Sequence, residues 1–216
     1  MALRNIRVDD DEILRKKSKV VKEITPRTAE LIDDLIDTVH ENNGVGLAAV
    51  QVGVLKRICV VTVEPPEIEL PELEEGEEGA EETEEMEELE PVEINPLSHN
   101  NGEDLIIINP EIIPREGEEE TDNEGCLSVP GKFGLVTRPY HITLKAFDRD
   151  MNPYELEAEG LFARAICHEC DHMDGILYTD KVEGELHDVS DIMPIDEEEE
   201  PEESAEEGET QEEASE

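Results

Sequence analysis

The sequence predicts an α+β domain in which antiparallel sheets surround a buried central helix that carries an H-E-x-x-H motif. Three observations lead to this prediction. Residues 161–173 are apolar on most sides of a helix, which is typical of a helix buried among sheets. Residues 57–63 and 105–109 are apolar runs that read as strands. Residues 141–147 and 154–159 alternate polar and apolar side chains, or nearly so, and indicate a hairpin.

The first element expected along the chain is an amphipathic helix. Thr25 and Pro26 are typical of an N-cap and of the first helical position. Its apolar stripe has the spacing of one helical face: Leu31, Ile32, Leu35, Ile36 and Val39. Gly44 is expected to end this helix, because glycine accommodates the backbone of a helix terminus.

The charge of the chain is concentrated in two segments. The 216 residues have a formal net charge of −44, and residues 64–104 hold eighteen acids while residues 183–216 hold seventeen, with no Lys or Arg in either. Glutamates repel one another, and such segments have little apolar surface to offset the entropy cost of ordering. We therefore expect one domain over 1–182, interrupted by an acidic low-complexity insert over 64–104, and a disordered acidic tail over 183–216.

The composition also limits where the protein acts and what it contacts. The N-terminal stretch lacks the apolar core of a signal peptide, and no run approaches the length of a membrane span. The four cysteines show no disulfide-type spacing, so a reducing cytoplasm is expected. The acidic balance argues against direct binding of nucleic acid, because phosphates would be repelled.

Two overlapping metal-site patterns lie on the predicted buried helix. They are H-E-x-x-H from His168 to His172 and C-x-x-C from Cys167 to Cys170. At roughly 100° per residue the two histidines lie about 40° apart. Cys170 lies about 200° from His168, and Cys167 about 260°. We expect the histidines to converge on a metal, with Glu169 suited to a general base, and the two cysteines to be small core thiols.

A catalytic metal site of this type needs a third protein ligand and an open position. Metzincin-type peptidases would have a histidine where this chain has Tyr178. Glu183 and Glu185 are the nearest downstream carboxylates, but little is there to position them. Upstream, Cys126 follows a glycine in a turn-like stretch, whereas Cys59 lies in a predicted buried strand. Cys126 is therefore the candidate thiolate ligand.

A second upstream stretch, "GVGLAAVQVG" over 44–53, follows the first predicted helix. Two glycines spaced by one residue allow the backbone to approach a ligand closely. The Gln51 amide can donate a hydrogen bond to a developing oxyanion. A phosphate loop is a weaker interpretation, because neither G-K-[ST] nor G-x-G-x-x-G is present. A helix C-cap followed by a packing turn explains Gly44 but not Gln51.

Taken together, these stretches resemble the peptide deformylase family, which carries three motifs in a fixed order. They appear here as "GVGLAAVQ" over 44–51, "EGCLS" over 124–128 and "HECDH" over 168–172. The resemblance covers the domain but neither acidic segment. Three residues depart from the family pattern, which usually has proline, glutamine and leucine there: Val50, Cys167 and Met173. None of the three is a ligand or the base.

The resemblance implies an enzyme that hydrolytically removes formyl from the N-terminal formylmethionine of new bacterial proteins. Cys126, His168 and His172 are then expected to bind one divalent metal, which is Fe²⁺ in the native family enzymes. A thiolate with two imidazoles also suits Zn²⁺, Ni²⁺ or Co²⁺. Glu169 is expected to take a proton from water and to pass it to the leaving amine.

The resemblance also implies the substrate contacts. The Gln51 side chain and the Leu127 backbone N–H would stabilise the oxyanion. The remaining residues expected along the substrate backbone and around its methionine side chain are Val45, Gly46, Glu124, Gly125 and Leu161. The expected partners are N-formylmethionyl peptides and nascent chains, with the ribosome as a transient partner and with neither membrane nor direct nucleic acid.

Two other classes of function stay open. A metzincin-like metallopeptidase would need the third histidine that this sequence lacks. A non-catalytic deformylase-like binding module would be expected to lose Glu169 or a ligand, and none is lost. Outside the metal ligands, Asp171 and Arg138 are a candidate ion pair that would hold the buried helix.

Overall fold

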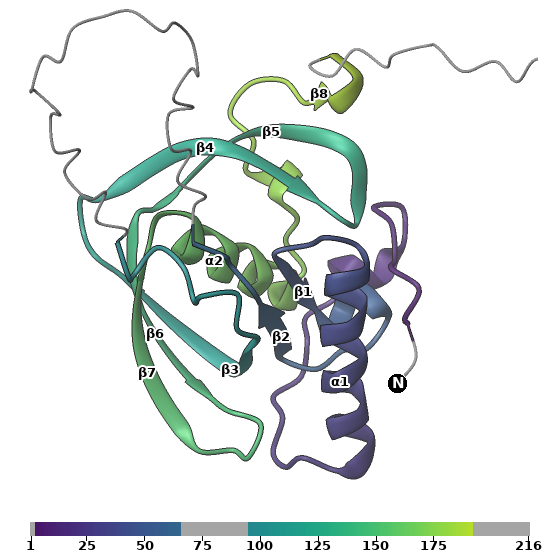
Figure 1. The fold of residues 1–216 in the computed structure, drawn as a ribbon. Helices are drawn as coiled ribbons and strands as arrows, with labels where there is room; N and C mark the ends of the chain where they lie inside the picture. Colours follow the sequence, from purple (N-terminus) through teal and green to yellow (C-terminus); the bar gives the residue numbers. More distant parts are fainter. Residues whose placement is uncertain (1–2, 66–94, 192–216) are drawn as a thin grey trace, which may run out of the picture.

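The computed structural model describes residues 3–65 and 95–191, and it has two antiparallel sheets with one helix between them (Figure 1). The first sheet has the strand order β1-β2-β3-β6-β7. Its strands are β1 (Gly46–Ala48), β2 (Ile58–Val61), β3 (Leu105–Pro114), β6 (His141–Phe147) and β7 (Pro153–Glu159). The second sheet consists of β4 (Glu119–Cys126), β5 (Val129–Pro139) and β8 (His187–Asp188), in that order. The predicted α+β class is confirmed.

Over the described residues the helices are α1 (Pro26–Glu41) and α2 (Gly160–Asp174), with four short 3-10 turns. The turns are η1 (Glu12–Arg15), η2 (Ala49–Val52), η3 (Tyr178–Asp180) and η4 (Val189–Asp191). The predicted cap of α1 is confirmed, because the Thr25 hydroxyl accepts the Thr28 N–H at 3.2 Å. The helix ends earlier than predicted, since Asn43 and not Gly44 takes the left-handed conformation, with φ of 50°.

The hairpin predicted over 141–159 is confirmed, with β6 and β7 paired from His141–Glu159 to Phe147–Pro153. The predicted strand at 105–109 extends further, because β3 continues past an irregularity between Ile108 and Glu111. The strands of the long β4–β5 hairpin were not predicted from the sequence. In this region the sequence indicated only a turn-like stretch around Cys126. The β4 arm of this hairpin carries mostly exposed polar residues, which hide the alternation of a strand.

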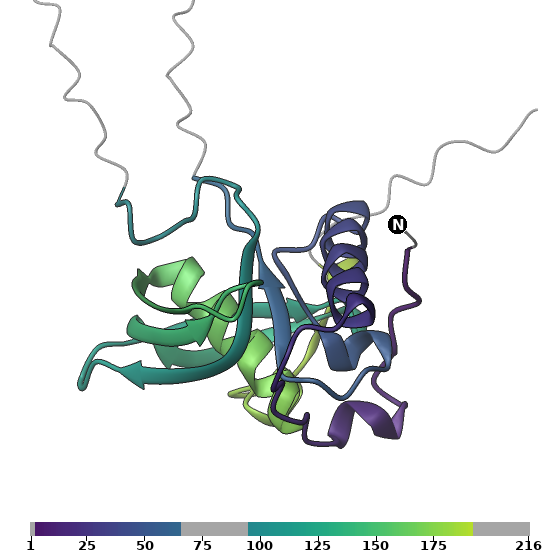
Figure 2. The ribbon, with the colours of Figure 1, turned by 90° about the horizontal axis from the view of Figure 1, so that it is seen from below.

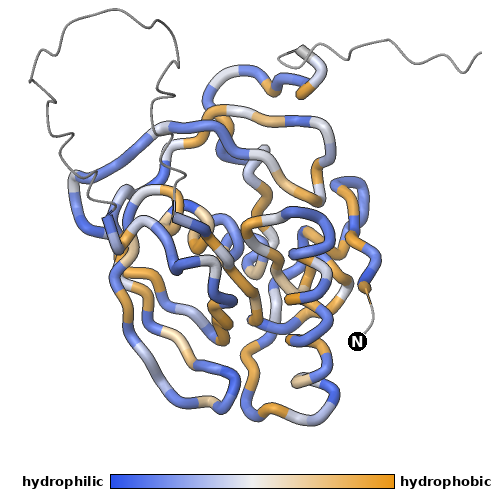
Figure 3. Tube along the Cα trace, viewed as in Figure 1, coloured by the Kyte–Doolittle hydropathy of each residue, from blue (hydrophilic) through white to orange (hydrophobic). Residues whose placement is uncertain are grey.

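Helix α2 lies against the five-stranded sheet, and α1 covers the other side of β1 and β2 (Figures 1 and 2). The helix α1 alternates apolar and polar stretches along the chain, as expected for a helix with one buried face (Figure 3). Cys59, Cys167 and Cys170 all belong to the core between α2 and the sheet. These three cysteines are therefore core thiols, as their positions in the sequence predicted.

The described part of the acidic insert contacts the domain. Asn100 accepts the Val63 N–H at 2.7 Å and donates to the Val61 carbonyl at 3.1 Å. The Glu159 N–H donates to the Leu97 carbonyl at 2.7 Å. Most of the predicted insert and tail, residues 66–94 and 192–216, lies outside the described residues. Within the described residues, no helix is long and apolar enough to cross a membrane.

Gly175 gives the first testable prediction. It ends α2 with φ of 77°, and a Cβ added there would lie 2.6 Å from the Arg15 carbonyl oxygen. Gly175→Ala should cost about 1–2 kcal/mol for the left-handed backbone and about 1–3 kcal/mol more for the overlap. Urea unfolding measures the loss. Gly117→Ala is the control, because Gly117 has φ of 80° and open space around its Cβ position. Equal losses in the two variants would contradict the packing argument.

A candidate metal centre in the cleft beside helix α2

The predicted ligands Cys126, His168 and His172 lie together in the structure. Their ligand atoms all lie within 4.8 Å of one another. The sulfur of Cys126 and Nε2 of His172 are 3.2 Å apart, and the two imidazole rings meet edge to face with centroids 4.9 Å apart. Two consecutive turns of α2 supply the histidines, and the last residue of β4 supplies the cysteine.

This group of side chains fits one metal ion. Thiolate and imidazole are ligands of zinc, iron and nickel, and around a tetrahedral ion their donor atoms stand roughly 3.5 Å apart. Burial lowers the pKa of His172, which favours the neutral ligand form of its ring. Nδ1 of His172 is buried and has no hydrogen-bond partner among the described residues.

Glu169 lies beside the ligands on α2 and is buried. Its Oε2 atom has no hydrogen-bond partner among the described residues. Gly46 of β1 lies so close that an added Cβ would be 2.7 Å from its Oε1. Burial raises the pKa of Glu169 to about 7. A carboxyl group with this pKa can take up and release a proton near neutral pH.

Gln51 lies on the η2 turn, where only 1% of its surface is exposed. Its Oε1 accepts the Ala48 N–H at 2.7 Å. Its Nε2 donates to the Ser128 hydroxyl at 3.2 Å and lies 3.6 Å from the sulfur of Cys126. The carboxamide therefore points its NH2 group toward the ligand group, as a donor near the reacting atoms would.

A cleft with a volume of about 730 Å³ opens above this group. The predicted substrate, oxyanion and base residues all line it: Val45, Gly46, Gln51, Glu124, Gly125, Leu127, Leu161 and Glu169. Two of the ligands, Cys126 and His168, line it as well. Val45 and Leu161 are about half exposed, so they form an apolar part of its mouth.

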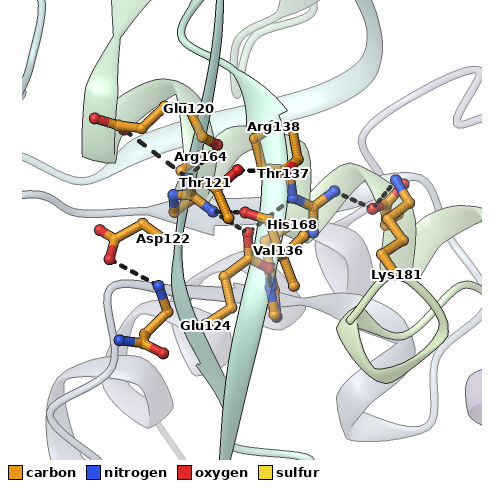
Figure 4. A network of polar contacts seen from close by, with 12 residues as sticks. Glu120, Thr121, Asp122, Glu124, Val136, Thr137, Arg138, Arg164, His168 and Lys181 are labelled. Atoms are coloured by element: carbon orange, nitrogen blue, oxygen red, sulfur yellow. Dashed lines mark hydrogen bonds and ion pairs between the residues drawn. The ribbon is translucent and has the colours of Figure 1, made fainter. Parts of the chain in front are cut away.

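Glu124 lines the cleft and also forms buried contacts that the sequence did not predict. Arg138 donates to both of its oxygens at 2.8 Å, and Arg164 donates to Oε1 at 2.9 Å (Figure 4). Nδ1 of His168 is 2.9 Å from Oε2. Burial alone would raise the pKa of Glu124, but the hydrogen bonds with Arg138 and His168 hold it well below its usual range. The carboxylate thus fixes the orientation of His168, one of the expected ligands.

Arg138 joins this cluster to the outer face of α2. It pairs with Asp171, and Lys181 contacts the same carboxylate at 2.6 Å. The predicted pair of Asp171 and Arg138 is therefore confirmed. Arg164 and Ser128 were missed by the sequence analysis. Arg164 had a detectable signal, because a charge within an otherwise apolar buried helix needs a partner.

The structure does not supply the third ligand of a metzincin. Tyr178, at the position of that histidine, donates its hydroxyl to the Lys132 carbonyl at 3.0 Å, and its ring stacks on His168. Glu183 and Glu185 are exposed, and neither belongs to the ligand group found among the described residues.

Comparison with known proteins agrees with this geometry. A family profile described as "Polypeptide deformylase" matches residues 3–187. A peptide deformylase of Lachnoclostridium phytofermentans is 48% identical over 200 residues, which are 93% of this chain and 99% of that protein. Among solved structures, a peptide deformylase from Ehrlichia chaffeensis in complex with actinonin is 34% identical with a TM-score of 0.66, over 85% of this chain and 90% of that one.

A second solved structure is the Met-Ala-Ser-bound class I type b peptide deformylase from Acinetobacter baumannii. It is 26% identical with a TM-score of 0.65, over 84% of this chain and 99% of that one. Sequence and fold thus agree over the whole domain that carries the three motifs. The chain therefore belongs to the polypeptide deformylase family, whose members are metal-dependent hydrolases.

Proposed function

We propose that this enzyme hydrolyses the formamide bond of N-terminal formylmethionine in newly made proteins, with the roles below. The observation that carries the proposal is the convergence of Cys126, His168 and His172 beside Glu169, with the amide nitrogen of Gln51 3.6 Å from the sulfur of Cys126 at the same cleft. The two alternatives, a metzincin-like metallopeptidase and a non-catalytic binding module, are less favoured. The third histidine of a metzincin is absent, and a non-catalytic module would not need an intact set of ligands and base.

Cys126, His168 and His172 would hold one divalent cation, with Fe²⁺ as the native metal and Zn²⁺, Ni²⁺ or Co²⁺ as substitutes. A cation held there would supply Lewis acidity, which activates water and polarises a carbonyl oxygen at neutral pH. Glu124 would keep His168 in its ligand orientation through the bond at Nδ1, while Arg138 and Arg164 keep Glu124 ionised.

Glu169 would move the proton. Its buried carboxylate faces the cleft, and Oε2 has no protein partner among the described residues, so it is available to accept a proton from the attacking water. A pKa of about 7 lets the same group release that proton to the leaving amine. Gly46 makes this arrangement possible, because a side chain there would displace Glu169.

Gln51 and the Leu127 backbone N–H would donate to the negative charge that develops on the formyl oxygen. Gly46 and Gly125 would let the peptide backbone of the substrate approach closely. The methionine side chain would enter the apolar part of the cleft near Val45 and Leu161, with Glu124 and His168 at its base. The Met-Ala-Ser complex of the Acinetobacter baumannii relative supports a short methionyl peptide as the ligand class.

The enzyme would act in the cytoplasm on nascent chains, with transient contact to the ribosome. The catalytic domain would span 1–182, with the segments 64–104 and 183–216 as an acidic insert and tail. Formate release from formyl-Met-Ala-Ser, with metal analysis of anaerobically purified protein, tests this function. No formate release from a protein loaded with any of the four metals would refute it.

The second prediction concerns Glu169. Glu169→Gln should retain the metal, because Glu169 is not a ligand, and it should lose nearly all turnover because the water loses its proton acceptor. Metal content and formate release are measured on the same sample. Near-full activity in this variant would show that the proton takes another route.

The third prediction separates the cysteines. Cys126→Ala should lose both metal and activity, since it removes a ligand. Cys170→Ala is the matched control on the opposite face of α2. It should keep both, at a cost of about 1 kcal/mol in unfolding free energy for one small buried group. Equal metal loss in the two variants would overturn the assignment of ligand faces.

The fourth prediction concerns the acidic segments. Replacing 66–94 with about ten Gly/Ser residues and ending the chain at residue 191 should leave deformylation within about threefold, because closure entropy changes slowly with loop length. It should also tighten ribosome association at low salt, where repulsion of RNA by the acids is least screened. Pelleting with ribosomes measures this association.

A chain that ends at Lys181 is the contrasting control. It loses Val182, which packs against a core cluster, and Val189, which lines the cleft. That cluster consists of Leu14, Val129, Val136, Leu177 and Tyr178. This chain should be less stable and less active than one that ends at residue 191. A large loss of activity in the longer variant, without unfolding, would show instead that an acidic segment contributes to the site.

A further inference from the structure

Ser128 is buried directly behind the candidate site, with none of its surface exposed. It lies in the turn between β4 and β5, two residues after the ligand Cys126. Its backbone N–H points to the sulfur of Cys126 at 3.4 Å, and its hydroxyl oxygen accepts the Gln51 amine at 3.2 Å. Ser128 therefore contacts both the ligand group and the expected oxyanion donor, through different atoms.

The orientation of the Gln51 carboxamide follows from its partners. A backbone N–H can only donate, so the Gln51 atom that faces the Ala48 N–H at 2.7 Å must be the amide oxygen. The NH2 group of the carboxamide is then turned toward Ser128. It carries two hydrogens, and the Ser128 hydroxyl accepts one of them.

The second amine hydrogen is the one available for catalysis. In the structure this end of Gln51 lies 3.6 Å from the sulfur of Cys126, which is a weak hydrogen-bond acceptor. Gln51 and Cys126 both line the cleft. A carbonyl oxygen that enters the cleft can therefore take this hydrogen at little cost, while the first hydrogen stays on Ser128.

We propose that Ser128 is a positioning residue whose hydroxyl holds the Gln51 amide in the orientation that directs its second N–H at the substrate carbonyl. This inference rests on the proposed function, because Gln51 acts as an oxyanion donor only in that reaction. Without the hydroxyl, one amine hydrogen loses its acceptor in a buried site, and the amide can turn toward other partners.

The test is a double-mutant cycle on formyl-Met-Ala-Ser with wild type, Ser128→Ala, Gln51→Ala and the double variant. Removing an oxyanion donor typically lowers kcat by about 10²–10³-fold. Loss of one of the two bonds that orient the donor should lower it less, by about fivefold, since a net hydrogen bond is worth roughly 1 kcal/mol. KM should stay within about twofold and metal content should not change, because the hydroxyl contacts neither the metal ligands nor the peptide.

The double variant decides the matter, because Ser128 has nothing to position once Gln51 is gone. Its kcat should equal that of Gln51→Ala within about twofold. If the two single effects multiply instead, or if Ser128→Ala loses metal, Ser128 acts through Cys126 or through packing and the proposal is wrong. Ser128→Thr keeps the hydroxyl and should retain more activity than Ser128→Ala.

Ser128→Cys covers the case in which the alanine variant fails to fold. Its thiol nearly matches the hydroxyl in size but accepts hydrogen bonds weakly, so kcat should fall by less than in Gln51→Ala while metal content stays full. Full activity in Ser128→Cys would overturn the proposal. Absence of formate release from the wild type would instead refute the proposed function itself.

Discussion

The site depends on one buried ionic contact, that of Glu124 with Arg138 and Arg164. Arg138 belongs to β5 and Arg164 to α2, so the carboxylate ties the β4–β5 hairpin to the buried helix. The same carboxylate bonds to His168, and two residues further along β4 the chain supplies Cys126. Breaking one partner of a buried charge cluster leaves another charge uncompensated, which is strongly destabilising. The same contact therefore orients His168 and holds the β4–β5 hairpin on α2. A substitution that breaks it would disturb both.

Around this contact, three segments far apart in the sequence supply different chemical parts. The η2 turn brings Gln51, the end of β4 brings Cys126, and α2 brings the two histidines with Glu169. Regular elements or tight turns hold all of them, and groups that must act together within fractions of an ångström need such rigid support. Val45 and Leu161, two of the exposed apolar residues of the cleft, offer apolar surface at its mouth.

Much of this arrangement could be predicted from the sequence, and the limits have physical causes. Helical periodicity placed His168 and His172 on one face, and the glycine before Cys126 indicated the turn that directly follows this third expected ligand. The contacts of Glu124 with the arginines could not be predicted, because pairing between β4, β5 and α2 is set by tertiary packing that no local pattern encodes. Ser128 was missed for a similar reason, since a serine in a turn is ordinary until its buried partner is known. The end of α1 was misplaced because Asn43, which also tolerates the left-handed region, takes the position expected for Gly44.

The C-x-x-C pattern on α2 shows why helix geometry and burial must be considered together. A thiol binds metal as the thiolate, so its environment decides whether it competes for the ion. Burial raises the pKa of Cys167 to about 12 and that of Cys59 well above its usual value, which keeps both protonated in the core. Cys126 differs in position, because it lines the cleft and its sulfur lies 3.2 Å from Nε2 of His172. One helix thus carries two metal-site patterns, and only the pattern whose side chains face the cleft meets a third ligand. The two cysteines of the C-x-x-C pattern lie on the core side of the same helix, where they contribute to packing.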